Sequence, residues 1–430
     1  MGRNKIISYS DFVMMVSSCL LIFCLPFAKA GAETFTWMAI FLWIFKRVLG
    51  YRAKGCYGIF PETELNKALV IFIAFNIVSV LFSVNLALSM RGFLGKTLKF
   101  IGIYFVVVEV INNNNRLRGL LISIIASVVL IIIDAGFQYF KGVDFLRGYV
   151  WMPLRASFST RNGFSAWLIV IIFLLLGLLI SKRNISVNRN INRALKSLLL
   201  ILVVLSVLCL LATFVRGAWF AFLIAILLTV SFIFRKISLK NKLIYLSIGL
   251  SLLLIFLILP QPIKSKITTI GRINFKTSGT INARIKSTVS VTEPGVNIRL
   301  KLWKEAARII KDYTFFGCGL NTYSIVAKRY RSFEGGGIYP HNSYLQMVAE
   351  TGLFGLCAFL WVLLVFFNTG IRYLNKKEDY LVLGLLSSIL AFLIHAFFDN
   401  HLYSLQLVVL FWFILGLTVA IIRIDQKELA

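Results

Sequence analysis

The polar residues best suited to chemistry gather in one motif near position 341. His341 directly precedes a long apolar segment, and Asn342, Gln346 and Glu350 then recur every four residues. A helix that begins here would carry the imidazole at its N-terminus, where the dipole favours anions and an uncharged histidine. A neutral histidine beside an anion can act as a general base, whereas its structural alternative is to cap the helix. The polar stripe that follows is expected to face a cavity or the bundle interior.

A second candidate is Arg299, which lies in an amphipathic segment over residues 298–311. Its solvent-facing side carries the basic residues Lys301, Lys304, Arg308 and Lys311. Its apolar side carries Leu302, Trp303, Ala306 and Ile310. Arg299 stands three and four residues before Leu302 and Trp303, so it shares their face and points toward the protein or the membrane. It could bind phosphate there, or it could be an arginine that snorkels at a helix end.

A third candidate, Arg216, stands with Gly217 between two apolar stretches that are otherwise almost continuous. An arginine within the hydrocarbon layer is costly, so a tight turn at the membrane surface is expected here rather than one long helix. The guanidinium could bind an anion at that surface, or it could close the turn against helix carbonyls.

Membrane-spanning helices must position these side chains. Apolar residues make up 59% of the chain and charged residues 15%, against about a half and a quarter in a soluble domain. The excess forms continuous blocks of roughly 17–25 residues, the length of a transmembrane helix. The chain is therefore predicted to be an all-α membrane protein with about twelve spans. They are expected near residues 11–28, 34–49, 68–84, 93–111, 117–140, 163–181, 197–215, 218–234, 243–259, 343–367, 380–398 and 403–422.

Lys and Arg in the short loops set the orientation. They favour one set of loops by about three to one, which predicts that both termini are cytoplasmic. The chain then divides into nine spans over residues 1–259, a large periplasmic loop over 260–342 and three spans over 343–430. Within the loop, residues 263–297 are polar and are expected to be irregular. Residues 1–30 could instead be a cleaved signal peptide, but eleven further spans make a retained first helix the simpler interpretation.

The charge and the cysteines exclude other classes of protein. The formal net charge of +29 comes from Lys and Arg in the predicted cytoplasmic loops and in the predicted periplasmic part. It does not come from a basic soluble domain. A nucleic-acid partner is therefore not expected, whereas the basic inner loops should contact anionic membrane lipids. The six cysteines form no disulfide framework, and no Cys or His cluster has metal-ligand spacing. Neither a metal nor another cofactor is expected.

Secondary candidates border the outer ends of the spans. Arg155, Arg161 and Asn162 precede the sixth span and could contact glycan or phosphate, or anchor the interface. His395 and Asp399 are expected one helical turn apart near the end of the eleventh span, in a lining or structural role rather than as a second catalytic pair.

Two lysines and an aspartate lie within the predicted spans. Lys96 and Lys99 lie in the fourth span, and Asp134 lies in the fifth. A lysine–aspartate pair between neighbouring helices is the structural interpretation, and a track for lipid phosphates is the alternative.

Several stretches resemble the O-antigen ligase and O-antigen polymerase superfamily, in family order over about residues 155–365. The most specific is residues 340–355, PHNSYLQMVAETGLFG, which looks like the family's H-N-x-x-L-x-x-x-x-E-x-G-x-x-G signature. The others are Arg299 to Trp303 with Gly317-Cys318-Gly319, Arg216-Gly217-Ala218-Trp219, and Arg155 to Leu168 with Asn162-Gly163-Phe164. The resemblance implies a GT-C-like, metal-independent membrane glycosyltransferase.

The resemblance also implies a reaction. The donor would be a glycan on undecaprenyl diphosphate, and the acceptor in a ligase would be a sugar hydroxyl of lipid A-core at the periplasmic face of the inner membrane. Arg216 and Arg299 match the family's diphosphate-binding arginines, and His341 matches its base. We further expect Asn342, Tyr344 and Glu350 to contact substrate, with Arg155, Arg161 and Asn162 in the same role.

Other functions stay open at this point. A polymerase would use the same donor, but polymerases more often divide their chemistry between two large loops. The single long loop before the tenth span favours a ligase, whereas the arginines of residues 141–161 keep a polymerase open. A transferase that glycosylates protein is a close variant. A lipid-linked sugar transporter is less favoured because the two halves of the chain show no repeat.

Overall fold

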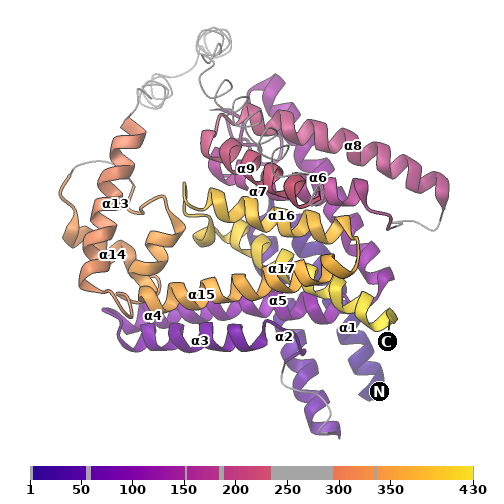
Figure 1. Ribbon diagram of the computed structural model, residues 1–430, viewed down its shortest axis with the longest axis horizontal. Helices are drawn as coiled ribbons and strands as arrows, with labels where there is room; N and C mark the ends of the chain where they lie inside the picture. Colours follow the sequence, from indigo (N-terminus) through magenta and orange to yellow (C-terminus); the bar gives the residue numbers. More distant parts are fainter. Residues whose placement is uncertain are drawn as a thin grey trace.

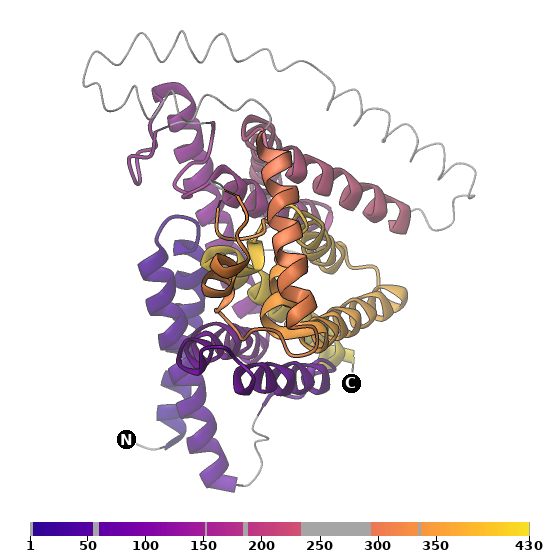
Figure 2. The same cartoon turned by 90° about the vertical axis from the view of Figure 1, so that its left-hand side faces the viewer.

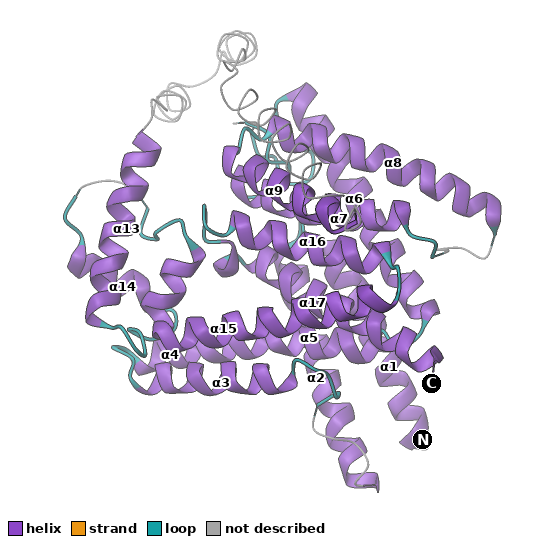
Figure 3. Ribbon diagram, viewed as in Figure 1, coloured by secondary structure: helices purple, strands orange, loops and turns teal. Residues whose placement is uncertain are grey.

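The computed structural model describes residues 3–54, 60–150, 153–183, 188–233, 294–333 and 337–429. The expected ninth span at 243–259 and most of the polar segment 263–297 lie outside these ranges. Within them the secondary structure is helical, apart from one isolated β-bridge between Val143 and Val150 (Figure 3). The predicted all-α class is therefore confirmed for the part of the chain that is described.

The helices run in the following order. They are α1 (Arg3–Cys24), α2 (Lys29–Lys54), α3 (Asn66–Leu81), α4 (Leu86–Gly92), the π-helix η1 (Phe93–Leu98), α5 (Lys99–Val110), α6 (Asn114–Lys141), α7 (Arg161–Ile180), α8 (Arg189–Ala212), α9 (Arg216–Ile233), α13 (Pro294–Asp312), α14 (Tyr323–Tyr330), α15 (Ser343–Lys376), α16 (Tyr380–His395), the 3-10 helix η2 (His401–Tyr403) and α17 (Leu405–Leu429). Each expected span except the ninth overlaps at least one of them.

Seven of the described helices are long and apolar enough to cross a membrane, so the chain is a multi-pass membrane protein. They are α1, α6, α7, α8, α9, α15 and α17. The helices α3 and α16 are apolar but shorter. The expected fourth span, 93–111, is divided into η1 and α5, because its first six residues are π-helical and follow directly on α4. The number of twelve spans stays a prediction.

The core of the bundle forms around α17. This helix is apolar on all sides and almost wholly buried, as expected of a central helix. It packs against α5 and α16, and α16 packs closely along α7. At that crossing a Cβ on Gly177 would lie 2.8 Å from the Tyr380 carbonyl oxygen. A Cβ on Gly384 would lie 2.5 Å from the Phe173 carbonyl oxygen, so both glycines are required for the close approach.

The two ends of the bundle differ. The helices α13 and α14 lie at one end, and both termini lie at the other (Figure 1). Viewed from the first end, α13 crosses in front of the bundle (Figure 2). The amphipathic helix predicted over residues 298–311 is thereby confirmed as α13, with Leu302 and Ala306 buried and Lys301 and Lys304 exposed. The short helix α14 was not predicted.

The helix α15 is interrupted where the segment after α13 crosses it. Gly352 has non-helical backbone angles, with φ 70° and ψ −178°. At this break the backbone amides of Cys318 and Gly319 donate to the carbonyl oxygens of Ala349 (2.8 Å) and Glu350 (2.9 Å). The segment after α13 therefore shares main-chain hydrogen bonds with α15, which couples α13 and α14 to the helix that follows His341.

The predicted turn at Arg216 is present, but it lies slightly earlier in the chain. The helix α8 ends at Ala212 and α9 begins with Arg216 itself. Phe214, in the connection, has a left-handed φ of 53°. The indole nitrogen of Trp219 donates to the Leu210 carbonyl oxygen at 2.9 Å, which ties the start of α9 to the end of α8.

The lysine–aspartate pair expected between the fourth and fifth spans is wrong. The Lys99 Nζ lies 2.9 Å from Glu33 of α2, and the Lys96 Nζ donates to the Asn321 side chain at 2.6 Å. Asp134 instead accepts from backbone amides of the loop that follows α6. Apolar composition on every side of these helices leaves their rotation within the bundle unspecified by the sequence.

Candidate functional site

The helix α15 begins at Ser343, two residues after His341, close to where the sequence predicted it. Its cap is Asn342, whose side-chain oxygen accepts from the backbone amides of Tyr344 and Leu345 at 3.0 Å each. His341 itself has a left-handed backbone, with φ 49°, which turns it out of the helical path. Because Asn342 performs the capping, the imidazole is available for another contact.

That contact is with Asp399, in the connection between α16 and η2. The Nδ1 of His341 lies 2.9 Å from the Asp399 Oδ1. The side chain of Asn162, near the start of α7, donates to the second carboxylate oxygen. The Asn400 backbone amide donates to Oδ1 at 2.8 Å. Three segments that are distant in the sequence therefore meet at one carboxylate.

This carboxylate is ionised. Burial acts to raise the pKa of Asp399, but the hydrogen bond from His341, the neighbouring His401 and the hydrogen bond from Asn162 together hold the pKa well below its ordinary value. An ionised Asp399 favours a proton on the Nδ1 of His341, which leaves Nε2 as the acceptor. A Cβ built on Gly337 would lie 3.4 Å from this Nε2, so the glycine keeps the space beside it narrow but free of a side chain.

The sequence prediction for Asp399 was incomplete. It placed Asp399 one helical turn after His395, in the same span, with a lining or structural role. In the structure α16 ends at His395 and the chain then turns, so the two side chains have different partners. A carboxylate that directly follows an apolar span was the available signal, but nothing local to it indicated His341 as its partner.

His395 instead pairs with His401. Both side chains are buried, and the Nδ1 of His395 lies 3.0 Å from the Nε2 of His401. Burial and the positive charge of Arg299 lower the pKa of His401 to about 4, although Asp399 acts in the opposite direction. His401 is therefore neutral near pH 7. The described residues contain no group of three or more His, Cys, Asp or Glu side chains that could hold a metal ion.

Two arginines approach this group from different elements. The positive charge of Arg299, near the start of α13, acts on Arg161 at the start of α7, as well as on His395 and His401. Both arginines are partly buried. Within the described ranges neither guanidinium has a carboxylate partner. Two like charges held close together without a counterion favour the binding of an anion.

Arg216 lies at the same end of the bundle. Its side chain is exposed at the first position of α9. The next residue, Gly217, packs on Phe398, since a Cβ there would lie 3.1 Å from the phenylalanine side chain. The ring of Phe220 also meets Phe398 edge-on, at 5.9 Å between centroids. The start of α9 therefore lies against the residue that precedes Asp399.

A tryptophan connects α13 to the histidine motif. The indole nitrogen of Trp303 donates to the carbonyl oxygen of Pro340 at 2.9 Å. Pro340 is buried and directly precedes His341. This bond fixes the backbone beside the imidazole relative to the helix that carries Arg299.

The other polar residues of this stripe on α15 face the bundle interior. This was one of the two orientations predicted from the sequence. The Asn400 side chain donates to Gln346, and the Gln346 amide donates to Glu350 at 3.2 Å. Glu350 is buried and also accepts from the Asn321 backbone amide at 3.0 Å. These contacts connect the loop that carries Asp399 to the break in α15.

Other residues expected at the site bond to nearby protein groups. Arg155 donates to the Ser159 carbonyl oxygen at 3.1 Å and lies over the Tyr149 ring. The Tyr344 hydroxyl donates to the Leu393 carbonyl oxygen at 2.8 Å, which ties α15 to α16. Substrate contacts by Arg155, Asn342, Tyr344 and Glu350 stay predictions.

A comparison with protein-family models matches residues 201–360 to the O-antigen ligase family. Over these residues, which make up less than half of the chain, the protein is similar to the O-antigen ligase family. The resemblance seen in the motifs is thereby confirmed. Members of this superfamily are membrane enzymes that transfer glycans from lipid-linked substrates. The matched residues include Arg216, Arg299 and His341, whereas Arg161, Asn162 and Asp399 lie outside the match. A comparison with curated proteins gave no match.

Proposed function

We propose that this protein is an O-antigen ligase of the bacterial inner membrane. It transfers a polysaccharide from undecaprenyl diphosphate to a sugar hydroxyl of lipid A-core at the periplasmic face. The family match supports the donor class. The excess of Lys and Arg in loops on the side of the termini supports a periplasmic position for the opposite end, where His341 lies.

The observation that carries this proposal is the His341–Asp399 pair, together with two arginines, Arg299 and Arg161, that have no carboxylate partner among the described residues. His341 has its Nδ1 on Asp399, so its Nε2 can take the proton of an acceptor hydroxyl. The hydroxyl oxygen then attacks the anomeric carbon of the donor sugar, and the bond from that carbon to the diphosphate oxygen breaks. The diphosphate leaves with the electron pair, while the ionised Asp399 stabilises the imidazolium. General-base catalysis of this kind contributes about 10²–10⁴-fold.

The arginines act on the leaving group. A lipid diphosphate needs stabilisation of its charge more than it needs protonation, and the planar fork of arginine binds phosphate oxygens through two hydrogen bonds. The positive charge of Arg299 acts on Arg161, and a bound diphosphate would offset both charges. Arg216, on the adjacent start of α9, would supply a third positive charge at the entrance.

A transfer assay with purified protein tests the proposal. The protein is supplied with lipid-linked glycan and lipid A-core, and the products are separated by gel electrophoresis. We expect glycan-capped core from the native protein and a loss of about 10²–10⁴-fold in rate for His341→Ala. Lys304→Ala is a suitable control because Lys304 lies on the exposed face of α13. Full activity of His341→Ala would remove the base from the mechanism.

An O-antigen polymerase is the second candidate. It is favoured by the contributions of Arg161 and Asn162, which stand at the start of α7, directly after the predicted outer loop 141–161, rather than in the segment that carries Arg299 and His341. A site that draws on two outer loops is the pattern expected of polymerases. Incubation with lipid-linked repeat units alone separates the two activities, since a polymerase lengthens the carrier-linked chain without lipid A-core whereas a ligase leaves it unchanged.

A further inference from the structure

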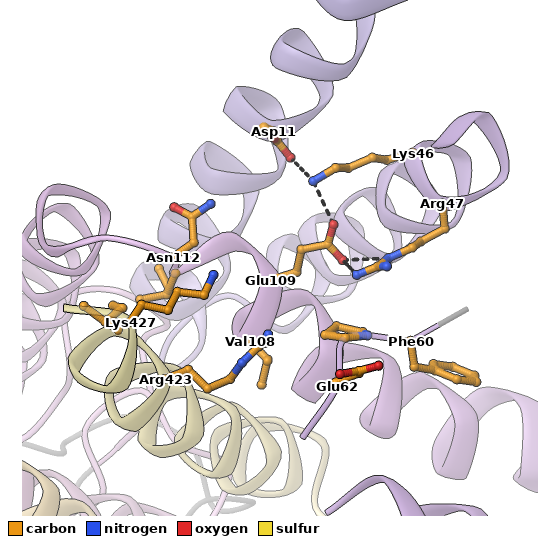
Figure 4. A pocket seen from close by; sticks show the side chains of 13 residues that line it. Asp11, Lys46, Arg47, Phe60, Glu62, Val108, Glu109, Asn112, Arg423 and Lys427 are labelled. Carbon is orange, nitrogen blue, oxygen red and sulfur yellow. Dashed lines mark hydrogen bonds and ion pairs between the residues drawn. The ribbon is translucent and has the colours of Figure 1, made fainter. Parts of the chain in front are cut away.

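Both termini lie at the end of the bundle opposite α13 (Figure 1). A cavity there is lined by residues near both termini, among others (Figure 4). This cavity has a volume of about 570 Å³ and is open to the outside. The size is typical of pockets for small molecules, roughly 300–1,000 Å³. Its lining comes from α1, α2, the segment before α3, α5 and its C-terminal connection, and α17. It shares no residue with the group around His341.

One wall of the cavity is electrostatically balanced. Lys46 Nζ lies 2.6 Å from the Asp11 carboxylate and 2.7 Å from Glu109 Oε1. The Nε of Arg47 donates to Glu109 Oε2 at 2.9 Å (Figure 4). Two cations and two carboxylates thus form one network between α1, α2 and α5. These four side chains have no need of a bound counterion.

The other wall carries positive charge that is not balanced in this way. Arg423 and Lys427 lie one turn apart on α17, and both line the cavity. No interaction joins them to the other side chains drawn in Figure 4. Among the described residues neither forms an ion pair, although Glu62 also lines the cavity. Arg423 is partly buried, and a partly buried guanidinium without a partner favours an anionic ligand.

The depth of Arg423 indicates where this ligand comes from. Arg423 stands 18 residues after Leu405, the first residue of α17, and at 1.5 Å per residue this is about 27 Å along the helix axis. The hydrocarbon layer is about 30 Å thick. Arg423 therefore lies near the level of the lipid headgroups on the side of the termini. Phe60, which is 40% exposed, lines the same cavity and offers an apolar surface beside the charges.

We propose that Arg423 and Lys427 bind the phosphate group of an anionic membrane lipid in this cavity. The arginine provides paired donors for two phosphate oxygens, and the lysine provides a second positive charge one helical turn away. Phe60 and the neighbouring apolar residues accommodate the glycerol and the upper part of the acyl chains. A soluble phosphate offers the same chemistry without this apolar part. The assignment does not depend on the proposed glycan transfer.

Native mass spectrometry of the full-length, delipidated protein tests this site. The protein in detergent is titrated with phosphatidylglycerol, and the retained lipid is compared between the native protein and the double variant Arg423→Gln, Lys427→Gln. We expect a discrete adduct on the native protein and about tenfold weaker retention by the variant, which corresponds to the loss of about one charge-assisted contact. Thermal midpoints measured in parallel establish that both proteins are folded.

The matched control is Arg193→Gln, Lys196→Gln. These exposed residues in the first two turns of α8 also lie one helical turn apart on one face, but they do not line the cavity. Equal retention of lipid by the two glutamine double variants would overturn the proposal. A second variant, Arg423→Lys, Lys427→Arg, conserves both charges. If it retained as little lipid as Arg423→Gln, Lys427→Gln, the proposal would also be overturned. Inorganic phosphate is then added as a competitor. If about 1 mM phosphate displaced the lipid, the ligand of these two side chains would be a soluble phosphate. The proposal that a lipid occupies the cavity would then be wrong.

Discussion

The carboxylate of Asp399 contacts the imidazole of His341 across 58 positions of the sequence, with 2.9 Å between Oδ1 and Nδ1. The side chain of His341 is 38% exposed and that of Asp399 is 16% exposed. The pair therefore has one reactive nitrogen toward the outside and its charged partner beneath. This arrangement is suited to a base that must become positively charged during the reaction and then lose its proton again.

Replacement of Asp399 by Asn should lower the transfer rate by about 10²-fold or more, because the amide can hold the imidazole in the wrong tautomer. The double variant His341→Ala, Asp399→Asn should be no slower than His341→Ala alone, since Asp399 acts through the histidine. Initial rates of transfer measure both. Multiplicative losses in the double variant would show that Asp399 acts independently of His341.

Variants of the two neighbouring arginines should weaken binding of the donor. Arg299→Lys retains the charge but loses the planar fork, so we expect a decrease in kcat/KM of about tenfold, and a larger decrease for Arg299→Gln. Arg161→Gln should act in the same direction if, as proposed, both arginines bind the same diphosphate. Rates measured against donor concentration test this. A normal kcat/KM in both glutamine variants would exclude an anion site between them.

The bond from Trp303 to Pro340 can be removed without removing the aromatic ring. Trp303→Phe loses only the donor to the Pro340 carbonyl oxygen and should cost about 1 kcal/mol of stability. The transfer rate should fall further than this small loss implies, because the backbone beside His341 is no longer held against α13. Thermal midpoints and transfer rates, measured on the same preparation, separate the two effects.

The break in α15 predicts a severe stability defect. Gly352 has a φ of 70°, and a Cβ there would lie 2.0 Å from the Phe315 carbonyl oxygen. Gly352→Ala should destabilise the fold by more than about 3 kcal/mol, since both the backbone angles and the space exclude a side chain. Gly136→Ala in α6 is the control, because nothing lies within 4 Å of its Cβ position. Thermal midpoints are measured from size-exclusion profiles after heating. Equal midpoints for Gly352→Ala and Gly136→Ala would contradict the prediction.

His401 predicts a stability change with pH. An unfolded chain binds a proton at this histidine below about pH 6.5, whereas the folded protein, with the pKa lowered to about 4, stays neutral there. Between these values the unfolded state binds more protons, so acidification through this window lowers the free energy of unfolding by about 3 kcal/mol at most. His401→Gln keeps a donor toward His395 and should reduce the fall in thermal midpoint between pH 7 and pH 5. An unchanged fall would contradict the assignment.

Much of the fold follows from the sequence because apolar length determines which segments cross a membrane. The helix α13 was also predictable, since Leu302, Ala306 and the intervening lysines repeat with the helical period. The interruption at Gly352 was not, because the hydrogen bonds that permit it come from a segment that is distant in the chain. The rotation of each helix was equally hidden, which explains why Lys99 pairs with Glu33 rather than Asp134.

The candidate site was predictable to a similar extent. His341 and Arg299 stand out because each is a polar residue at a marked position of a helix pattern. Asp399 and Arg161 join them only through the packing of α16 against α7, and no local pattern in the sequence records that packing. The side chains that carry the motif were therefore visible, whereas the partners that orient them required three-dimensional contacts.

The junction at Gly352 has a consequence for engineering chimeras between relatives. A Cβ on Gly317 would lie 2.3 Å from the Glu350 backbone, and one on Gly319 would lie 1.9 Å from the Ser83 hydroxyl oxygen. The segment after α13 thus packs against α15 and against the α3–α4 connection without room for an added side-chain atom. A chimera that receives residues 294–333 from a relative must also receive that relative's Gly352 region and α3–α4 connection, because the transplanted helices would otherwise clash with both.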